Sequence, residues 1–597
     1  MKQNILDSNI AYLDLNIAYN VESEEDIDIY CTELIGLEYS NKEEIQKIRN
    51  DMASYKILSD IFYAIWGYQR GKPFMFVLQE DYVDKAYRDS YYTYYSGKLY
   101  THSRFSKRVI LFCDTFNDRN FFDLTPKELN KKLIGSIVLR PLNIQVIGRT
   151  LLNPKYFMPS NSFVKTAEYN FTVFGKRLTV DAYPFSMQDG EVTTCAENTL
   201  VNLLDYYSTK YPDYHYLLPS EINKIALENG FERSVPSKGL APEVISRVLC
   251  EARFSPLLYS SYKIDMEKMR RILFYYIESG LPIAVGFNDF LEAHSITVIG
   301  HGFYKKSKDS ILSKTYGEFD GKSKSTTWFC DVANLVDEYY IMDDNLSPYQ
   351  SVKYFSFKNE QEVKKFVKKF IEAKKFELEK NDYIFSNVIS ENETHSINMK
   401  KIESLIVPLS KKMYLEATDA VDIFRSLLSS GKYSIKNALS NLNQEINQEN
   451  LNRIKKVICL ETLGNKDYPV IIRVYLASAR GYTRFKDKTL SNGYKVFYNS
   501  VVYPKFIWVC ELSTIETFKK NKIIGEIILD ATATPLQPLD SVILVNYPYQ
   551  IYIRKPKDSN GYLNDQIKHY DSEQFVYVED WQLFEPYYSL DRPNTKK

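Results

Sequence analysis

The sequence predicts an α+β protein whose central part combines a helical lobe with a sheet lobe. Apolar side chains recur every three or four positions, as along the buried face of a helix, in four successive segments: 195–211, 219–230, 241–252 and 265–280. Strand-like apolar runs follow these segments, at 281–287, 294–300, 326–334 and 339–344. Helices grouped before strands in one stretch of chain are typical of the α+β class.

The 597 residues are too many for a single hydrophobic core, and we expect three regions. A mixed α/β region over 1–150 contains strand-like runs such as PFMFVLQ and RVILFC. The central unit spans 151–375, and a charged amphipathic helix expected over 357–380 marks its end. A second mixed α/β region over 376–597 contains runs such as PVIIRVYLAS, and we expect it to recognise a substrate or partner.

Charge and cysteine content argue against several classes of protein. Lys and Arg together number 76, as do Asp and Glu, so the chain lacks the basic surplus of a dedicated nucleic-acid binder. The seven Cys include no CxxC pair, which argues against a zinc or redox pair and favours a reducing cytosol. No apolar run approaches the ~18 residues of a membrane span, and no signal-peptide core is visible. We therefore expect a cytoplasmic protein that binds neither membrane nor nucleic acid.

The candidate nucleophile is Cys195, at the start of the expected helix 195–211. Thr194 followed by Glu197 is a capping-box pattern, which places the beginning of the helix at the cysteine. The N–H groups and the dipole at a helix N-terminus favour a thiolate, which is the nucleophilic form of cysteine. Five of the other six cysteines fall in or beside apolar strands or inside a helix, and we expect those five to be small buried side chains.

A nucleophilic cysteine needs a base, usually a histidine, and the chain has six. His294 opens the strand-like run HSITVIGHG and follows a loop, where active-site residues are common. Because side chains alternate along a strand, His294 shares a face with Ile296 and Val298, whereas His301 falls on the other face. We therefore expect His294 to be the base and His301 to lie outside the same site.

Asp343 and Asp344, at the end of the run YYIMDD, are candidates to orient the imidazole. If this strand pairs with the one that His294 opens, alternation lets only one of the two face the ring; we prefer Asp343 and keep Asp344 open. Gln188, seven residues before Cys195, is the candidate oxyanion donor together with the Cys195 N–H. Taken singly, each of these residues also has an ordinary structural explanation, as a buried thiol, a strand cap or a turn.

The order Gln188, Cys195 at a helix start, His294 at a strand start and Asp343 resembles the papain-like cysteine peptidase superfamily. Within it, the nearest resemblance is to the bacterial branch related to peptidases that cleave double-glycine leaders. The strand PIAVGF before His294 and the apolar strand ending in Gly after it are similar to that pattern. The resemblance covers about residues 180–350. The spacing from Gln to Cys is one residue longer than usual, and Ala196 stands where Gly is common.

The resemblance implies a papain-like fold, with a helical lobe and an antiparallel sheet lobe, and an intracellular cysteine protease. Cys195 would attack a peptide or isopeptide bond, His294 would act as the base, Asp343 would orient it, and Gln188 would bind the oxyanion. No metal or organic cofactor is needed, and the expected partners are a protein or peptide substrate and a regulatory protein. Two alternatives stay open: a transglutaminase-like acyltransferase or deamidase, and a catalytically inert interaction scaffold.

Overall fold

The fold is known from a computed structural model, which describes residues 17–37, 52–116, 118–143, 146–228, 235–289, 292–321, 324–356, 383–386, 400–458, 462–536, 538–554 and 575–591. The helix expected over 357–380 lies outside these stretches. Within them the chain forms helices and three sheets, in which every strand pairing but one is antiparallel. The predicted α+β class is therefore confirmed. No described helix is both long and apolar enough to cross a bilayer.

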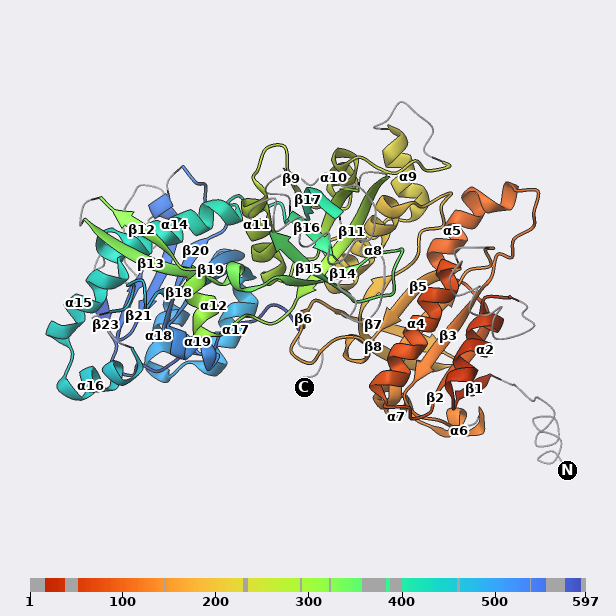
Figure 1. Ribbon diagram of the computed structural model, residues 1–597, viewed down its shortest axis with the longest axis horizontal. Coiled ribbons are helices and arrows are strands. Elements are labelled where there is room, and N and C mark those ends of the chain that lie inside the picture. The colour runs from red at the N-terminus through yellow and green to blue at the C-terminus, as the bar shows by residue number, and fades with distance from the viewer. Residues whose placement is uncertain are drawn as a thin grey trace.

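The N-terminal sheet has seven strands in the spatial order β1-β2-β3-β4-β5-β8-β7. Their bounds are β1 Ala18–Val21, β2 Phe74–Tyr82, β3 Ser106–Phe112, β4 Leu133–Leu139, β5 Ile147–Leu152, β7 Ala167–Val173 and β8 Lys176–Phe185. Helix α4 (Ala53–Tyr68) crosses one face of this sheet (Figure 1), and its buried residues Ile57, Ile61 and Ile65 recur at helical spacing. The other helices of this part are α2 Glu24–Leu34, α5 Lys85–Thr93, α6 Asp118–Asp123 and α7 Pro126–Lys132.

The middle sheet closes on itself as an antiparallel barrel, because β10 pairs with both β11 and β17. The ring runs through β10 Ile283–Asp289, β11 Glu292–His301, β14 Glu338–Met342, β15 Gln350–Ser356, β16 Tyr383–Ser386 and β17 Lys400–Val407. Strand β9 (Leu257–Ser260) adds to β17, and β6 (Phe163–Val164) adds to β11. Four helices precede or flank the ring: α8 Cys195–Lys210, α9 Pro219–Glu228, α10 Pro242–Glu251 and α11 Met266–Glu278. Closure leaves these six strands without a free edge along the ring.

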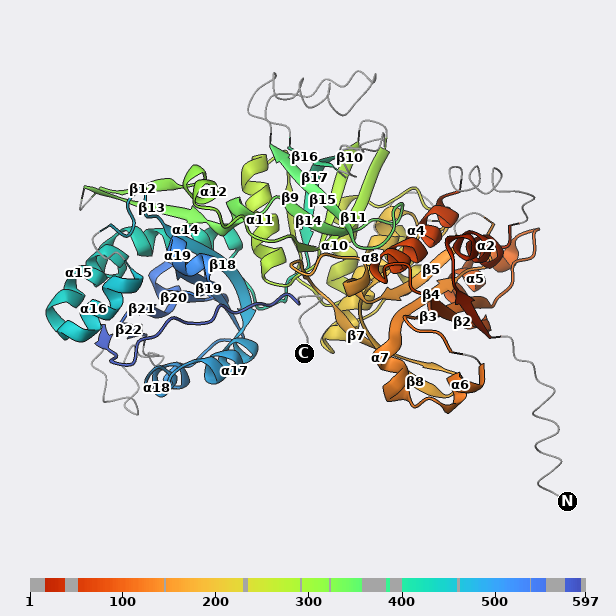
Figure 2. The same ribbon diagram turned by 60° about the horizontal axis from the view of Figure 1, so that its bottom comes forward.

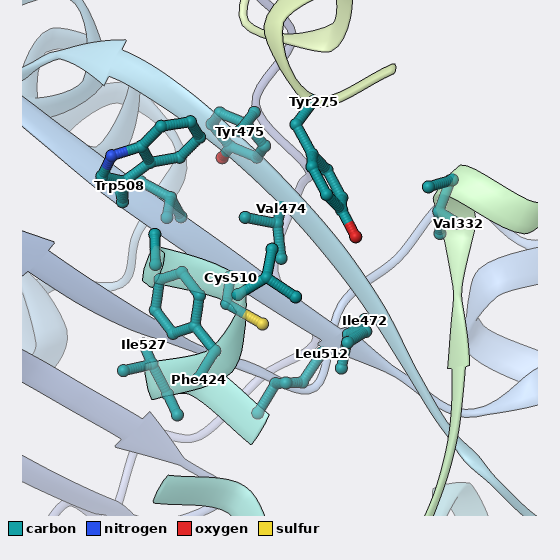
Figure 3. Close-up of a cluster of buried hydrophobic side chains, with 14 of the residues drawn as sticks. Tyr275, Val332, Phe424, Ile472, Val474, Tyr475, Trp508, Cys510, Leu512 and Ile527 are labelled. Atoms are coloured by element: carbon teal, nitrogen blue, oxygen red, sulfur yellow. The ribbon is translucent and has the colours of Figure 1, made fainter. Parts of the chain in front are cut away.

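The C-terminal sheet has eight strands in the order β12-β13-β18-β19-β20-β21-β22-β23, and its β13–β18 pair is the parallel one. Its strands are β12 Tyr316–Asp320, β13 Ser325–Asp331, β18 Val470–Ser478, β19 Phe506–Ser513, β20 Gly525–Asp530, β21 Val542–Tyr547, β22 Gln550–Ile553 and β23 Val576–Tyr577. The helices are α12 Lys308–Ser313, α14 Ala417–Ser429, α15 Ile435–Glu445, α16 Gln448–Val457, α17 Ala479–Thr489, α18 Asn492–Ser500 and α19 Ile515–Lys519. Figure 3 shows part of its core, where Trp508, Cys510 and Leu512 of β19 lie near Phe424 of α14 and Ile472 of β18.

Strands from different parts of the sequence share these sheets. β7 and β8, which follow residue 150, complete the N-terminal sheet, and β12 and β13, which precede residue 375, begin the C-terminal one. β16 and β17, which follow residue 375, close the barrel. Figures 1 and 2 show the barrel between the other two sheets along the long axis. The division at 150 and 375 stays a prediction, and the sheets are the units used below.

A buried ionic network joins the barrel to the C-terminal sheet. Glu278, at the end of α11, lies 2.6 Å from the His301 Nε2 atom and accepts a hydrogen bond of 2.7 Å from Arg473 Nε of β18. Arg473 Nη1 also donates to Glu511 of β19, at 2.6 Å. All four side chains are buried, so each charge depends on its partner for the solvation that water would otherwise supply.

This network makes stability sensitive to acid. Burial alone would raise the pKa of Glu278, but the Arg473 guanidinium and the His301 and Tyr304 side chains outweigh it and lower that pKa from 4.5 to about 2. A depressed folded-state pKa contributes stability above the unfolded value, and this contribution disappears as pH falls from about 4.5 through 2. The melting temperature of wild type should therefore fall as the pH is lowered from about 4.5 to 2.

The test variant is Glu278→Gln. The control is Glu243→Gln, at an exposed position of α10. Because Glu278→Gln leaves Arg473 with one charged partner fewer, we expect it to cost about 3–5 kcal/mol at neutral pH. Its melting temperature should then vary less with pH between about 4.5 and 2 than that of wild type or of Glu243→Gln. An unchanged acid profile in Glu278→Gln would contradict this assignment.

Candidate active site

Cys195 is the first residue of α8, as the capping box predicts. Thr194 precedes it in extended conformation, and both its N–H and its hydroxyl donate to the Glu197 carboxylate, at 3.1 and 2.5 Å. The Ser237 hydroxyl donates to the other carboxylate oxygen. Glu197 is buried whereas Cys195 is half-buried. The capping interactions therefore lie in the interior, and the cysteine is closer to the surface.

Helix α8 is anchored to the N-terminal sheet by a two-pronged ion pair. Arg149 of β5 donates to both carboxylate oxygens of Asp205, through Nε at 2.7 Å and Nη2 at 3.1 Å. Such fork geometry fixes orientation as well as distance. On the same helix, Asn198 Nδ2 donates to the Ser186 carbonyl at 2.6 Å, and the Ser186 hydroxyl donates back to Asn198 Oδ1 at 2.6 Å. The start of α8 is therefore bound to the loop that precedes it.

Helix α8 and strand β11 lie side by side (Figures 1 and 2), and their contacts follow in the same order along both elements. The Thr199 hydroxyl donates to the Ser295 carbonyl at 3.1 Å, and the Tyr207 hydroxyl donates to the Pro282 carbonyl at 3.2 Å. Pro282 precedes Ile283, which pairs with Val298 of β11. From the first contact to the second, the helix rises about 12 Å and the strand about 13 Å, so the two elements stay in step.

Extending this alignment backwards places Cys195 about 3 Å farther along the contact than His294, at the same end of it. Cys195 lies one helical turn, about 6 Å, before Thr199, and His294 lies one strand residue, about 3 Å, before Ser295. The structure thus brings both residues to the same end of the α8–β11 contact.

The His294 ring is held by an aspartate. Its Nε2 atom lies 2.8 Å from Asp343 Oδ1 and 3.8 Å from Asp344 Oδ1, and the three side chains are between 3% and 9% exposed. Asp343 Oδ1 also accepts the Asn345 N–H at 3.1 Å, which fixes the carboxylate against its own turn. The shorter distance and the extra hydrogen bond favour Asp343 as the orienting residue.

Gln188 lies beside the same turn. Its side-chain Nε2 donates to Asn345 Oδ1 at 3.3 Å, two residues after Asp343. The loop from Gln188 to Cys195 is shaped by Asp189, whose Oδ1 accepts the N–H groups of Glu191, Val192 and Thr193 at 2.8–2.9 Å. The four residues singled out in the sequence therefore come from three segments that meet at one end of the barrel.

Arg140 also holds this loop, a role that the sequence analysis did not assign to it. It directly follows the buried strand β4 and is itself buried. Its Nη2 donates to the carbonyls of Met187 at 3.0 Å and Gln188 at 3.4 Å. A charged residue directly after seven buried strand residues is the one sequence signal that could have indicated a buried polar partner. Arg140 is thus a positioning residue for Gln188.

The other cysteines differ from Cys195 in their surroundings. Burial raises the pKa of the Cys330 thiol to about 12 and raises that of Cys510 well above its ordinary value, so both stay protonated. The expectation that Cys250 is buried is wrong: it is exposed on α10, because the buried face of that helix is made by Ile245, Val248 and Leu249. Cys459 lies outside the described residues.

His301 lies apart from the candidate site, as predicted, seven residues along β11 from His294. It is fully buried at the far end of β11, in the network with Glu278. His294, Asp343 and Asp344 also form a group that could hold a cation, since their ligand atoms lie within 4.8 Å of one another. A cation there would compete with Asp343 for the same Nε2 atom, so it would replace the triad arrangement and could not add to it.

Comparison with known proteins adds no assignment: no protein-family model matches the chain, and no curated protein is a detectable relative.

The two aspartates can be separated by substitution. If Asp343 holds the ring, Asp343→Asn should lower the rate of any reaction that uses His294 as its base by about 10²–10⁴-fold. The imidazole would lose both its orientation and the stabilisation of its cation. Asp344→Asn is the matched control, one residue away and equally buried, and should cost much less. Turnover rates of the two variants measure this, and the reverse order would transfer the role to Asp344.

Arg140 can be tested through Gln188. Arg140→Met removes the donor to the two loop carbonyls while keeping a long side chain, and we expect turnover to fall about tenfold through loss of the oxyanion donor's position. Arg140→Lys should recover part of that loss. In a Gln188→Ala background the Arg140→Met change should have little further effect on turnover, whereas full additivity would mean that Arg140 acts elsewhere.

Proposed function

We propose that this protein is a papain-like cysteine protease that cleaves a peptide or isopeptide bond. Cys195 is the nucleophile, His294 the base, Asp343 the residue that orients the base, and Gln188 the oxyanion donor. The observation that carries the proposal is the His294–Asp343 pair, 2.8 Å long, at the same end of the α8–β11 contact as the helix start that bears Cys195. His294 and Asp343 are 49 positions apart in the chain, and Cys195 lies 99 positions before His294, so a purely local structural explanation does not require them to meet.

The architecture around these residues supports the same proposal. An antiparallel barrel presents a histidine at the beginning of one strand and an aspartate just after the neighbouring strand. A long helix with cysteine as its first residue packs along the outside of that barrel. This arrangement is similar to the helical and sheet lobes of the papain-like superfamily.

The proposed reaction begins with proton transfer from the Cys195 thiol to His294, which gives a thiolate and an imidazolium. Since Asp343 is bonded to Nε2, the other ring nitrogen, Nδ1, is the atom that exchanges the proton with the thiol. The thiolate attacks the substrate carbonyl, and the developing oxyanion accepts hydrogen bonds from Gln188 and the Cys195 N–H. His294 then protonates the leaving amine, and water hydrolyses the acyl-enzyme.

His294 pairs with Phe287 of the neighbouring strand β10, so the two side chains lie on the same face of the sheet. Hydrogen bonds between a nucleophile and its base commonly form only when substrate is bound.

The triad predicts a reactive thiol, which can be measured without knowing the substrate. A cysteine reacts as its thiolate, and a histidine base activates it by taking up the thiol proton. We expect iodoacetamide at pH 6.5 to label Cys195 at least about tenfold faster than Cys250, quantified by peptide mass spectrometry. Cys250 is an exposed cysteine on the same chain and serves as the internal control.

His294→Ala should reduce the labelling rate of Cys195 to that of Cys250. Cys195→Ala should abolish cleavage of a peptide mixture, a loss of at least about a thousandfold. Cleavage that survives in Cys195→Ala would refute the proposed nucleophile. Labelling of Cys195 no faster than Cys250, together with no cleavage by wild type, would favour the inert papain-like scaffold.

The acyltransferase or deamidase alternative uses the same residues and differs only in what attacks the acyl-enzyme. Incubation with a fluorescent primary amine and a glutamine-containing peptide distinguishes the two, because only an acyltransferase incorporates the amine. A deamidase would release ammonia without breaking the peptide chain.

We place the protease in the cytosol, on the ground that unpaired cysteines are kept reduced there.

A further inference from the structure

A cavity of about 430 Å³ lies next to the turn that carries Asp343. Helix α4, the segment near Phe157, and strands β14 and β15 with the turn between them form its walls. The volume falls in the range of ~300–1,000 Å³ that small-ligand pockets occupy. Nothing in the proposed catalytic steps uses this cavity.

The lining has two chemical features. Among the described residues that line it, the only charged side chains are Asp60 and Glu338, so its formal charge is negative. Four of the other lining residues are aromatic: Tyr63, Phe157, Tyr340 and Tyr349. Phe157 and Tyr349 stack with their centroids 5.9 Å apart. Carboxylates beside aromatic faces are the surroundings that bind an organic cation.

The cavity is tied directly to the candidate site. The Ser347 hydroxyl, in the lining, donates to Asp60 Oδ2 of α4 at 2.9 Å. Ser347 belongs to the same turn as Asp343, whose carbonyl accepts the Leu346 N–H at 3.0 Å. The four residues of chain from Asp343 to Ser347 reach at most about 14 Å, so the edge of the cavity at Ser347 lies within about four substrate residues of the His294–Asp343 pair.

We infer that this cavity is a specificity pocket that binds a basic side chain of the peptide substrate, Arg or Lys. The cationic head lies between Asp60 and Glu338, and its aliphatic stem packs on the aromatic rings. The pocket selects a substrate residue a few positions from the scissile bond. This inference rests on the proposed peptidase function for the identity of the substrate, but the binding of the cation does not depend on catalysis.

Binding can therefore be tested in the Cys195→Ala protein. The probes are Nα-acetyl-arginine methylamide and its uncharged isostere Nα-acetyl-citrulline methylamide, titrated by ligand-observed NMR. We expect the citrulline probe to bind about tenfold more weakly, a difference of about 1.4 kcal/mol. In Asp60→Asn/Glu338→Gln, which retains oxygen acceptors at both positions, the two probes should bind equally. Equal binding of both probes to the parent protein would overturn the inference.

Two further controls keep the result interpretable. The single variant Glu338→Gln leaves the Ser347–Asp60 hydrogen bond in place, so it should weaken arginine binding without loosening the turn. Melting temperatures show that each variant is folded. A preference for arginine that persists unchanged in the double variant would locate the cation elsewhere and reject this pocket.

Cleavage of a peptide mixture, read by mass spectrometry, separates this inference from the proposed function. Wild type should cleave at sites enriched in Arg or Lys at one fixed distance from the scissile bond, and the double variant should lose that enrichment. Cleavage without the enrichment, combined with equal probe binding, rejects the pocket and keeps the protease. Selective binding of arginine with no cleavage by wild type keeps the pocket and rejects the protease.

Discussion

The candidate site depends on the packing of α8 along β11. Helix α8 supplies the N-terminus with Cys195, and strand β11 supplies the imidazole of His294. The proposed cysteine chemistry needs both. The hydroxyls of Thr199 and Tyr207 bind carbonyls of the barrel at two levels, and the rises of helix and strand match between them. A shift of one strand residue would break both contacts, so this register determines where Cys195 and His294 stand.

Polar groups hold the loop between β8 and α8. Arg140 donates to its carbonyls from the N-terminal sheet, Asp189 accepts three of its N–H groups, and Asn198 binds it to α8. Arg140 and Asn198 are buried and would be costly to bury without these bonds, so the loop has few alternative conformations of similar energy. The acidic cavity contacts the Asp343 turn through Ser347, so both supports meet at the candidate site.

The parts of the site predicted from the sequence are those that local interactions decide. The capping box needs only Thr194 and Glu197, three residues apart, and it placed the start of α8 correctly. His301 does lie apart from His294, but a register irregularity between Val298 and Gly300 interrupts the alternation on which that prediction relied. Burial was predicted less well: Cys250 is exposed, because the face that a helix buries depends on which distant element covers it.

By itself, the sequence determined the helix start at Cys195, the strand that contains His294, and the α+β class, since these follow from hydrogen bonds and periodicities within a few residues. Tertiary structure alone decided which strands share a sheet and which aspartate holds the ring. Asp343 and Asp344 are chemically equal neighbours, and their 2.8 and 3.8 Å distances to His294 are set by the path of a turn. That path is held by Ser347 and Asp60, which lie 287 positions apart in the chain.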